Sequence, residues 1–328
     1  MCLVFTPRIA AAARRRAAAR RAGKTNFRRT EVLSEYRSHN MSTGLAGLAR
    51  VRHEHLNLGG DLRILLSIAE PLSCTALHPK FVLYVLDPEP ELFAIATAHM
   101  YSRYGYEFTE GNEPFMRHVA IVGVGHDPAL YDANAYGFNA AKLRDLRRKH
   151  FRDDKGGFLQ ALGSQIVPQA EALLSISDGI TRSERALLGC SLSSLAALRT
   201  SLRSYSDAEG AGCAGDVFGA LLLGSPSLIF TPELIDEASV AASAPAPSDG
   251  RLPVKVLMVV GEMEALPEPV GNGIPAASEA MAARLRAGGH SVECISIVGE
   301  NHDSLKPSLI SRGFTALEEW WSSKYHTL

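Results

Sequence analysis

The chain has 328 residues and a formal net charge of −1, with 46 % hydrophobic and 21 % charged residues. This length and composition indicate a globular protein of one large or two small domains, and they exclude a disordered chain, a collagen-like repeat and a disulfide-stapled miniprotein. The five cysteines are scattered and include no C-x-x-C pair, which argues against a zinc site and fits a reducing, cytoplasmic compartment.

The near-neutral charge hides a basic amino-terminal segment. Residues 1–30 contain nine basic and no acidic residues, so residues 31–328 hold 25 basic and 35 acidic side chains. We expect residues 1–44 to be a low-complexity extension, disordered or preceding a true start at Met41. An organelle transit peptide and a phosphate-binding arm are the alternatives, although nucleic acid is not an expected partner. No apolar run reaches 18 residues, so no membrane span is expected.

Short apolar segments alternate with helical patterns in the rest of the chain. The expected strands are Arg50–Leu56, Leu62–Ala69, Phe81–Leu86, His118–Val124, Arg185–Cys190, Phe218–Leu223, Val254–Val260 and Val292–Val298. The expected helices are Phe158–Leu174, Ser193–Ser204, Pro232–Ala238, Ala276–Ala287 and Ser308–Lys324. This alternation predicts one α/β domain at residues 45–328, with about eight mostly parallel strands and helices on both faces of the sheet.

The character of the strands indicates their place in the sheet. Phe81–Leu86 and Val256–Val260 are apolar on both faces, which is typical of central strands covered by helices. The first two expected strands carry charged residues, which is typical of edge strands.

The segment Gly189-Cys190-Ser191-Leu192-Ser193 lies between an expected strand and an expected helix. It matches the nucleophile elbow G-x-S-x-G, in which a strained turn exposes the hydroxyl of the serine. Ser193 replaces the second glycine, and this weakens the match. A serine that merely caps a helix beside a glycine is the alternative interpretation.

A serine nucleophile needs a base, usually histidine, that a carboxylate orients. In α/β-hydrolases these residues follow in the order serine, acid, histidine, each just after a strand. The strand ending at Val260 leads to Glu262 and Glu264, and the last strand leads to His302. The order therefore predicts Ser191 and His302 as a catalytic pair, and it leaves the choice between the two glutamates open.

Other histidines offer alternatives. His126 follows an expected strand and is a rival base, although it precedes the serine in the chain. His53 and His55 flank a glutamate and suggest a metal site, but two histidines two apart on a strand more often form an exposed face. We expect neither a metal nor an organic cofactor.

Further segments recur in a recognisable order from Phe81 to the C-terminus. They are Val82–Leu86 with Asp87, Val122–Gly125, Arg144-Asp145-Leu146, Gly156–Leu159, Ile166-Val167-Pro168, Ser225-Pro226-Ser227, Gly261–Glu264 and Gly299–Asp303. In this order they resemble the esterase D and enterochelin (siderophore) esterase family of α/β-hydrolases. The resemblance implies that Ser191 is the nucleophile and that His302 is the general base, which later protonates the leaving alcohol. It also implies that Glu264, at the family's G-x-x-E position, orients His302.

The resemblance also implies an oxyanion hole and a substrate contact. The backbone N–H of Leu192 would be the first oxyanion donor. The family's second donor falls here on Pro88, which has no N–H, so either Glu89 or a shifted loop supplies the donor, or the oxyanion hole is weaker. Arg144 would meet an anionic substrate, or else form a structural ion pair.

Two departures from the family fall near the expected site. Leu228-Ile229-Phe230 follows the S-P-S segment in place of tryptophans, and the segment Tyr101–Arg117 looks like a polar and aromatic insertion. We therefore expect a pocket unlike that of siderophore esterases.

Together these features predict a serine carboxylic-ester hydrolase that forms an acyl-enzyme and acts on a small-molecule ester, of siderophore type or another small ester. The alternatives are an acyl transferase or thioesterase with the same triad, and a catalytically impaired hydrolase-fold binding protein. Pro88 and Ser193 motivate the last alternative. The sequence does not indicate the oligomeric state.

Overall fold

The computed structural model describes residues 49–71, 79–87, 90–108, 118–130, 139–155, 157–176, 179–206, 217–243, 253–266 and 272–325. All of them fall in one compact unit, Ala46–Leu328. The expected extension, residues 1–44, lies outside the described residues, so the domain boundary stays a prediction.

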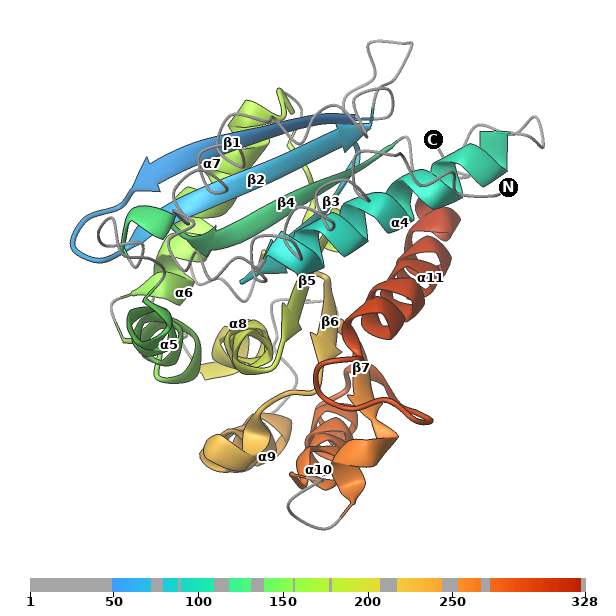
Figure 1. Cartoon of the computed structure of the whole chain (residues 1–328). Coiled ribbons are helices and arrows are strands. Elements are labelled where there is room, and N and C mark those ends of the chain that lie inside the picture. Colours follow the sequence, from blue (N-terminus) through green and yellow to red (C-terminus); the bar gives the residue numbers. More distant parts are fainter. Residues whose placement is uncertain are drawn as a thin grey trace, which may run out of the picture. The chain divides into compact units, whose positions relative to one another are not determined.

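One eight-stranded sheet forms the centre of this unit, in the order β1-β2-β4-β3-β5-β6-β7-β8 (Figure 1). The pairs β1–β2 and β2–β4 are antiparallel, and all later pairs are parallel. The strands are β1 (Ala49–Asn57), β2 (Arg63–Pro71), β3 (Phe81–Leu86), β4 (Val119–His126), β5 (Arg185–Cys190), β6 (Ala220–Gly224), β7 (Lys255–Gly261) and β8 (Ser291–Ile297). All eight expected strands are thus confirmed, with ends shifted by at most two residues.

The expectation that the first two strands lie at an edge is wrong for the second. β2 pairs with both β1 and β4, and the edges of the sheet are β1 and β8. The charged residues Arg63 and Glu70 of β2 stand near its two ends, whereas Ile64, Leu66 and Ile68 between them are buried. A charge near the end of a strand therefore says little about whether the strand has one neighbour or two.

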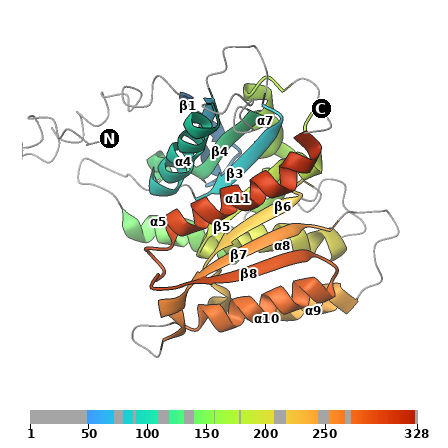
Figure 2. The same cartoon turned by 90° about the vertical axis from the view of Figure 1, so that its right-hand side faces the viewer.

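Helices cover both faces of the sheet. α4 (Pro90–Phe108) and α11 (Lys306–Tyr325) lie on one face (Figure 2). On the other face lie α8 (Leu192–Ser206), α9 (Glu233–Ser243) and α10 (Ile274–Ala287). The strands β3 and β6 are buried along their whole length between these layers. No helix within the described ranges is long and apolar enough to cross a membrane.

Four helical segments differ from expectation. The expected helix Pro232–Ala238 is α9 (Glu233–Ser243), which continues five residues further. The sequence did not predict α4 or α5 (Ala140–Arg147). The supposed insertion Tyr101–Arg117 is in part the end of α4, and its residues 109–117 lie outside the described residues. The expected helix Phe158–Leu174 is α6 (Phe158–Ala161) and α7 (Val167–Leu173), joined by the π-helical segment η4 (Leu162–Ile166).

Two histidines are buried together beside the sheet. His126 ends β4, and His150 lies in the π-helical segment η3 (Arg148–Arg152), with His126 Nε2 2.9 Å from His150 Nδ1. Burial lowers the pKa of His126 to about 3, and repulsion from His150 and Arg147 adds to this effect against the attraction of Asp61. Burial likewise lowers the pKa of His150. Both rings are therefore neutral at pH 7.

This pair makes the stability of the fold depend on pH. The folded-state pKa of His126, about 3, lies below the unfolded value of about 6.5. Between these two pKa values, His126 binds a proton in the unfolded chain but not in the folded protein. The free energy of unfolding therefore decreases as the pH falls below about 6.5. We expect His126 alone to lower the free energy of unfolding by about 2 kcal/mol between pH 7 and pH 5. Chemical denaturation of the wild type and of His126→Gln at both pH values measures this difference. Equal losses in the two proteins would contradict it.

Candidate active site

Ser191 occupies the turn between β5 and α8, and its φ of 62° lies in the left-handed region. Its backbone N–H donates to the carbonyl of Gly224 at the end of β6, at 2.8 Å. A Cβ atom at Gly189 would lie 2.6 Å from the backbone carbon of Ser193, closer than atoms can approach. The first glycine of the elbow is therefore required because the strand presses against the first turn of the helix.

Ser193, which replaces the second glycine, fits the turn through its hydroxyl. The side chain is 1 % exposed. Its Oγ accepts a hydrogen bond from the N–H of Cys190 and donates one to the carbonyl of Cys190, both at 2.9 Å. The hydroxyl is thus fully paired inside the turn that a glycine usually forms, so the departure from G-x-S-x-G leaves the elbow intact.

Leu192 is the first residue of α8. The N–H groups of the first helical turn have no acceptor within the helix, and the helix dipole makes this end partly positive. The N–H of Leu192 is thus suited to hold a negatively charged oxygen next to Ser191. Pro88 and Glu89 lie outside the described residues, so the second oxyanion donor stays a prediction.

Glu264 and Glu262 point in different directions from the short 3-10 helix η8 (Glu262–Ala265) after β7. Glu264 is buried, and its Oε2 lies 2.9 Å from Nδ1 of His302. Glu262 is exposed and accepts a hydrogen bond from the N–H of Gly299 at 3.1 Å. The structure thus brings Glu264, and not Glu262, to the histidine.

The carboxylate of Glu264 accepts four hydrogen bonds. Its Oε1 accepts from the hydroxyl of Ser225 and from the N–H of Gly261, and its Oε2 accepts from Asn272 Nδ2 as well as from His302. Burial raises the pKa of Glu264, but these four bonds outweigh burial and lower the pKa to about 2. The group is therefore a permanent anion beside the imidazole at neutral pH.

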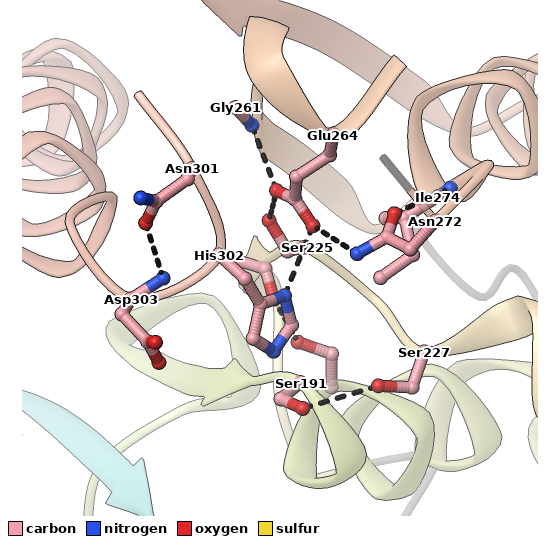
Figure 3. A network of polar contacts seen from close by, with 12 residues as sticks. Ser191, Ser225, Ser227, Gly261, Glu264, Asn272, Ile274, Asn301, His302 and Asp303 are labelled. Atoms are coloured by element: carbon pink, nitrogen blue, oxygen red, sulfur yellow. Dashed lines mark hydrogen bonds and ion pairs between the residues drawn. The ribbon is translucent and has the colours of Figure 1, made fainter. Parts of the chain in front are cut away.

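His302 lies between the acid and the serine. Figure 3 shows its ring below Glu264, with the second ring nitrogen turned towards Ser191. The turn that carries it is tightened by Asn301, whose Oδ1 accepts hydrogen bonds from the N–H groups of Asp303 and Ser304 at 2.9 and 3.0 Å. The Oγ of Ser191 itself lies 3.1 Å from the Oγ of Ser227.

Asn272 and Ser225 are site residues that the sequence analysis did not single out as such. Asn272 lies just before α10, where its Oδ1 accepts from the N–H of Ile274 and its backbone N–H donates to the carbonyl of Glu264 at 2.9 Å. Ser225 follows β6 with a φ of 36°. The S-P-S segment was a signal for Ser225, whereas no pattern in the sequence points to Asn272.

The expected substrate contact Arg144 is exposed on α5. Arg147, one helical turn further along the same helix, is the arginine that reaches the carboxyl edge of the sheet. Its Nε lies 2.5 Å from Oδ2 of Asp87, the buried residue that follows β3. The role of Arg144 as a substrate contact stays a prediction, and the ion pair that the described residues show at this edge belongs to Arg147.

The other candidate histidines have partners other than Ser191. His126, the rival base, is buried and bonded to His150. On β1, His53 bonds to Ser67 Oγ at 3.0 Å, and His55 pairs with Asp127 at 3.2 Å. In the part of the chain that the structure describes, no group of three or more His, Cys, Asp or Glu side chains is placed to hold a metal ion.

Comparison with known proteins identifies the fold. No protein-family profile and no curated protein matches the sequence. Among solved structures, the siderophore hydrolase EstB from Aspergillus nidulans is 20 % identical over 82 % of this chain and 95 % of its own, with a TM-score of 0.56. The siderophore hydrolase EstA from the same organism is 17 % identical over 82 % of this chain and 94 % of its own, with a TM-score of 0.58.

The enterobactin and salmochelin hydrolase IroE is also similar in structure. It is 17 % identical over 80 % of this chain and 95 % of its own, with a TM-score of 0.52. Together with the strand order, these similarities show the α/β-hydrolase fold and confirm the fold that the sequence predicts.

The four hydrogen bonds of Glu264 predict different effects of two neighbouring substitutions. Glu264→Gln places an amide N–H₂ among groups that are all donors, and we expect it to lower the free energy of unfolding by about 2–3 kcal/mol. Glu262→Gln, on an exposed side chain, should change it by less than about 0.5 kcal/mol. Chemical denaturation at pH 7 measures both, and equal effects of the two substitutions would contradict the assignment.

Proposed function

We propose that this protein is a serine carboxylic-ester hydrolase that works through an acyl-enzyme. The observation that carries the proposal is the placement of Ser191 on a strained strand-to-helix turn next to a His302–Glu264 pair joined at 2.9 Å (Figure 3). A serine, a histidine and a buried carboxylate in this relation are the groups that acyl transfer requires.

In the first half of the reaction, the Oγ of Ser191 attacks the ester carbonyl while its proton passes to Nε2 of His302. Glu264 holds the Nδ1–H of the ring and stabilises the imidazolium that forms. Its low pKa, about 2, keeps it ionised for this purpose. The N–H of Leu192 stabilises the negative carbonyl oxygen of the tetrahedral intermediate.

The imidazolium then gives its proton to the leaving alkoxide, and an acyl ester on Ser191 remains. In the second half, His302 removes a proton from water, which attacks the acyl carbonyl. The collapse of the second tetrahedral intermediate returns the proton to Ser191 and releases the carboxylic acid. No metal or organic cofactor enters any step.

For the substrate we propose a small-molecule ester, of siderophore type or another small ester. Hydrolases of siderophores are among the proteins that share this fold over nearly their whole length. We also propose that the protein works in the cytoplasm, which the scattered cysteines of the sequence, with no C-x-x-C pair among them, support.

Exposed apolar side chains near the site suggest how an ester would be held. Ile229, Phe230, Leu266 and Val298 are exposed and lie on the segments that follow β6, β7 and β8. The same three segments carry Ser227, Glu264 and His302. We propose that these four residues, the apolar rim, contact the apolar part of the ester, with Phe230 (62 % exposed) the largest of them.

Replacement of the nucleophile is the direct test of the proposed function. We expect Ser191→Ala to lower kcat on short p-nitrophenyl esters by on the order of 10⁴–10⁶ and to abolish labelling by a fluorophosphonate probe. Ser278→Ala, which removes a buried hydroxyl on α10, is the matched control and should keep full activity. Equal hydrolysis by wild type and Ser191→Ala would refute the assignment.

Product analysis separates the hydrolase from the related alternatives. With an added alcohol or thiol acceptor, a hydrolase yields mainly the free acid, whereas an acyl transferase yields the new ester or thioester. A panel of esters and thioesters that includes ferric and iron-free catecholate siderophores then identifies the substrate class.

The apolar rim predicts a change in selectivity. We expect Phe230→Ala to raise KM about tenfold for esters with a large apolar or aromatic group. The variant loses the apolar surface that the phenyl ring and the substrate bury against each other. The KM for an acetyl ester should stay nearly constant. Val51→Ala on β1, which removes an exposed apolar side chain at the edge of the sheet, is the control. The same shift for small and large esters would contradict the role of Phe230.

A further inference from the structure

The segment Ser225-Pro226-Ser227 after β6 places its two hydroxyls on two different members of the site. Ser225 donates to Oε1 of Glu264, whereas Ser227 contacts Ser191 (Figure 3). The backbone binds the same turn, since the N–H of Ser191 donates to the carbonyl of Gly224 and the N–H of Ser227 approaches the carbonyl of Ser191 at 3.4 Å. Ser227 is thus anchored next to the nucleophile through both backbone and side chain.

The hydroxyl of Ser227 is almost completely buried, with the residue 2 % exposed. Its Oγ lies 3.1 Å from the Oγ of Ser191, and Ser191 is the partner that the described residues offer it. A buried hydroxyl that could not donate would cost free energy. The contact between the two oxygens is therefore a hydrogen bond whose direction matters for the chemistry.

The number of protons on the two hydroxyls decides this direction. Each hydroxyl has one proton to donate and can accept two hydrogen bonds. When Ser191 attacks, its proton must point to Nε2 of His302, so it cannot point to Ser227 at the same moment. The bond between the two oxygens then has the Ser227 hydroxyl as donor and Ser191 Oγ as acceptor.

We propose that Ser227 is a further catalytic residue, which donates a hydrogen bond to the reacting oxygen of Ser191. The bond strengthens as negative charge develops on Oγ during attack, and again when Oγ leaves the acyl carbon in the second half of the reaction. The proton of Ser227 stays on Ser227 throughout, and no bond to it forms or breaks. This inference rests on the proposed function, because it needs Ser191 as the nucleophile.

The topology separates this role from that of an oxyanion donor. β5 lies between β3 and β6 in the sheet. The expected second donor to the carbonyl oxygen follows β3, whereas Ser227 follows β6, on the side of Glu264 and His302. Ser227 therefore serves the oxygen of the nucleophile, and Leu192 serves the oxygen of the substrate.

The rate of fluorophosphonate labelling of Ser191 tests the proposal without requiring the natural substrate. Hydrogen bonds to charged groups are stronger than those between neutral groups, so we expect Ser227→Ala to lower the second-order rate of labelling by about 10- to 100-fold. Ser227→Thr, which keeps a hydroxyl, should recover much of the rate. Ser278→Ala, the control with an equally buried serine, should react like the wild type.

The pH dependence of labelling distinguishes direct action from a change in packing. If Ser227 acts on Oγ, Ser227→Ala lowers the plateau of the rate and leaves the inflection pH unchanged, since the His302–Glu264 pair is untouched. A shifted inflection would mean that the substitution disturbs that pair, and it would overturn the proposal. An unchanged or faster labelling rate would overturn it too. Ser191 would then donate its proton to Ser227, and this bond would hold the proton away from His302.

Two further measurements complete the test. Thermal unfolding of Ser227→Ala verifies that the variant is folded. If it is not folded, Ser227→Thr is compared with the wild type instead. A labelling rate within about threefold of wild type is then expected, and a larger loss overturns the proposal. Failure of the proposed function looks different, because the wild type itself would then not be labelled at Ser191.

Discussion

The site depends on one buried charge, the carboxylate of Glu264. Removing an ion from water costs several kcal/mol unless hydrogen bonds replace the lost water. The four bonds to Glu264 come from Ser225 after β6, Gly261 at the end of β7, Asn272 before α10 and His302 after β8. The charge is therefore tolerated only when all of these segments are in place, and it acts as an assembly constraint on the loops of the site.

This constraint works because the backbone segments can approach one another closely. A Cβ atom at Gly261 would lie 2.4 Å from the carbonyl oxygen of Glu300, in the turn before His302. The backbone of Met263 donates to that same carbonyl at 3.0 Å. The acid loop and the histidine loop thus touch through their main chains, and the absence of a side chain at Gly261 makes the 2.9 Å contact between Glu264 and His302 possible.

The sequence was sufficient to predict the strands of the sheet and the order of the site residues along the chain. Strands such as β3 and β6 are apolar on both faces, a pattern that only a covered sheet accommodates. The sequence analysis did not predict α4, although Leu92, Ala96 and Met100 are spaced as one buried helix face, because the polar and aromatic residues that follow obscured the pattern.

The choice of the acid and the roles of Arg147 and Asn272 depend on tertiary contacts. Glu262 and Glu264 stand two residues apart on one short turn, and only its course shows which of them turns inward. Arg147 pairs with Asp87, which is distant in the chain, and Asn272 bonds to Glu264 eight residues earlier, so neither contact follows from a sequence motif.

The strained residues of the site are held by the sheet itself. Asp87, Ser191 and Ser225 have positive φ, and each directly follows one of the adjacent strands β3, β5 and β6. Such a conformation costs on the order of 1–3 kcal/mol for a residue other than glycine. Yet the N–H of each still donates to a carbonyl of a neighbouring strand at 2.8–2.9 Å. The acceptors are Val124 for Asp87, Gly224 for Ser191 and Val259 for Ser225.

The hydrogen-bond ladder thus continues one residue beyond each strand before the chain turns away. Because Ser191 is bonded to the end of β6, and the turn after β6 is bonded to β7, the nucleophile is fixed relative to the segments that carry Ser227 and Glu264. The buried strands below cannot shift without losing their packing. The strain at the carboxyl edge therefore orients the reacting side chains instead of relaxing into the loops.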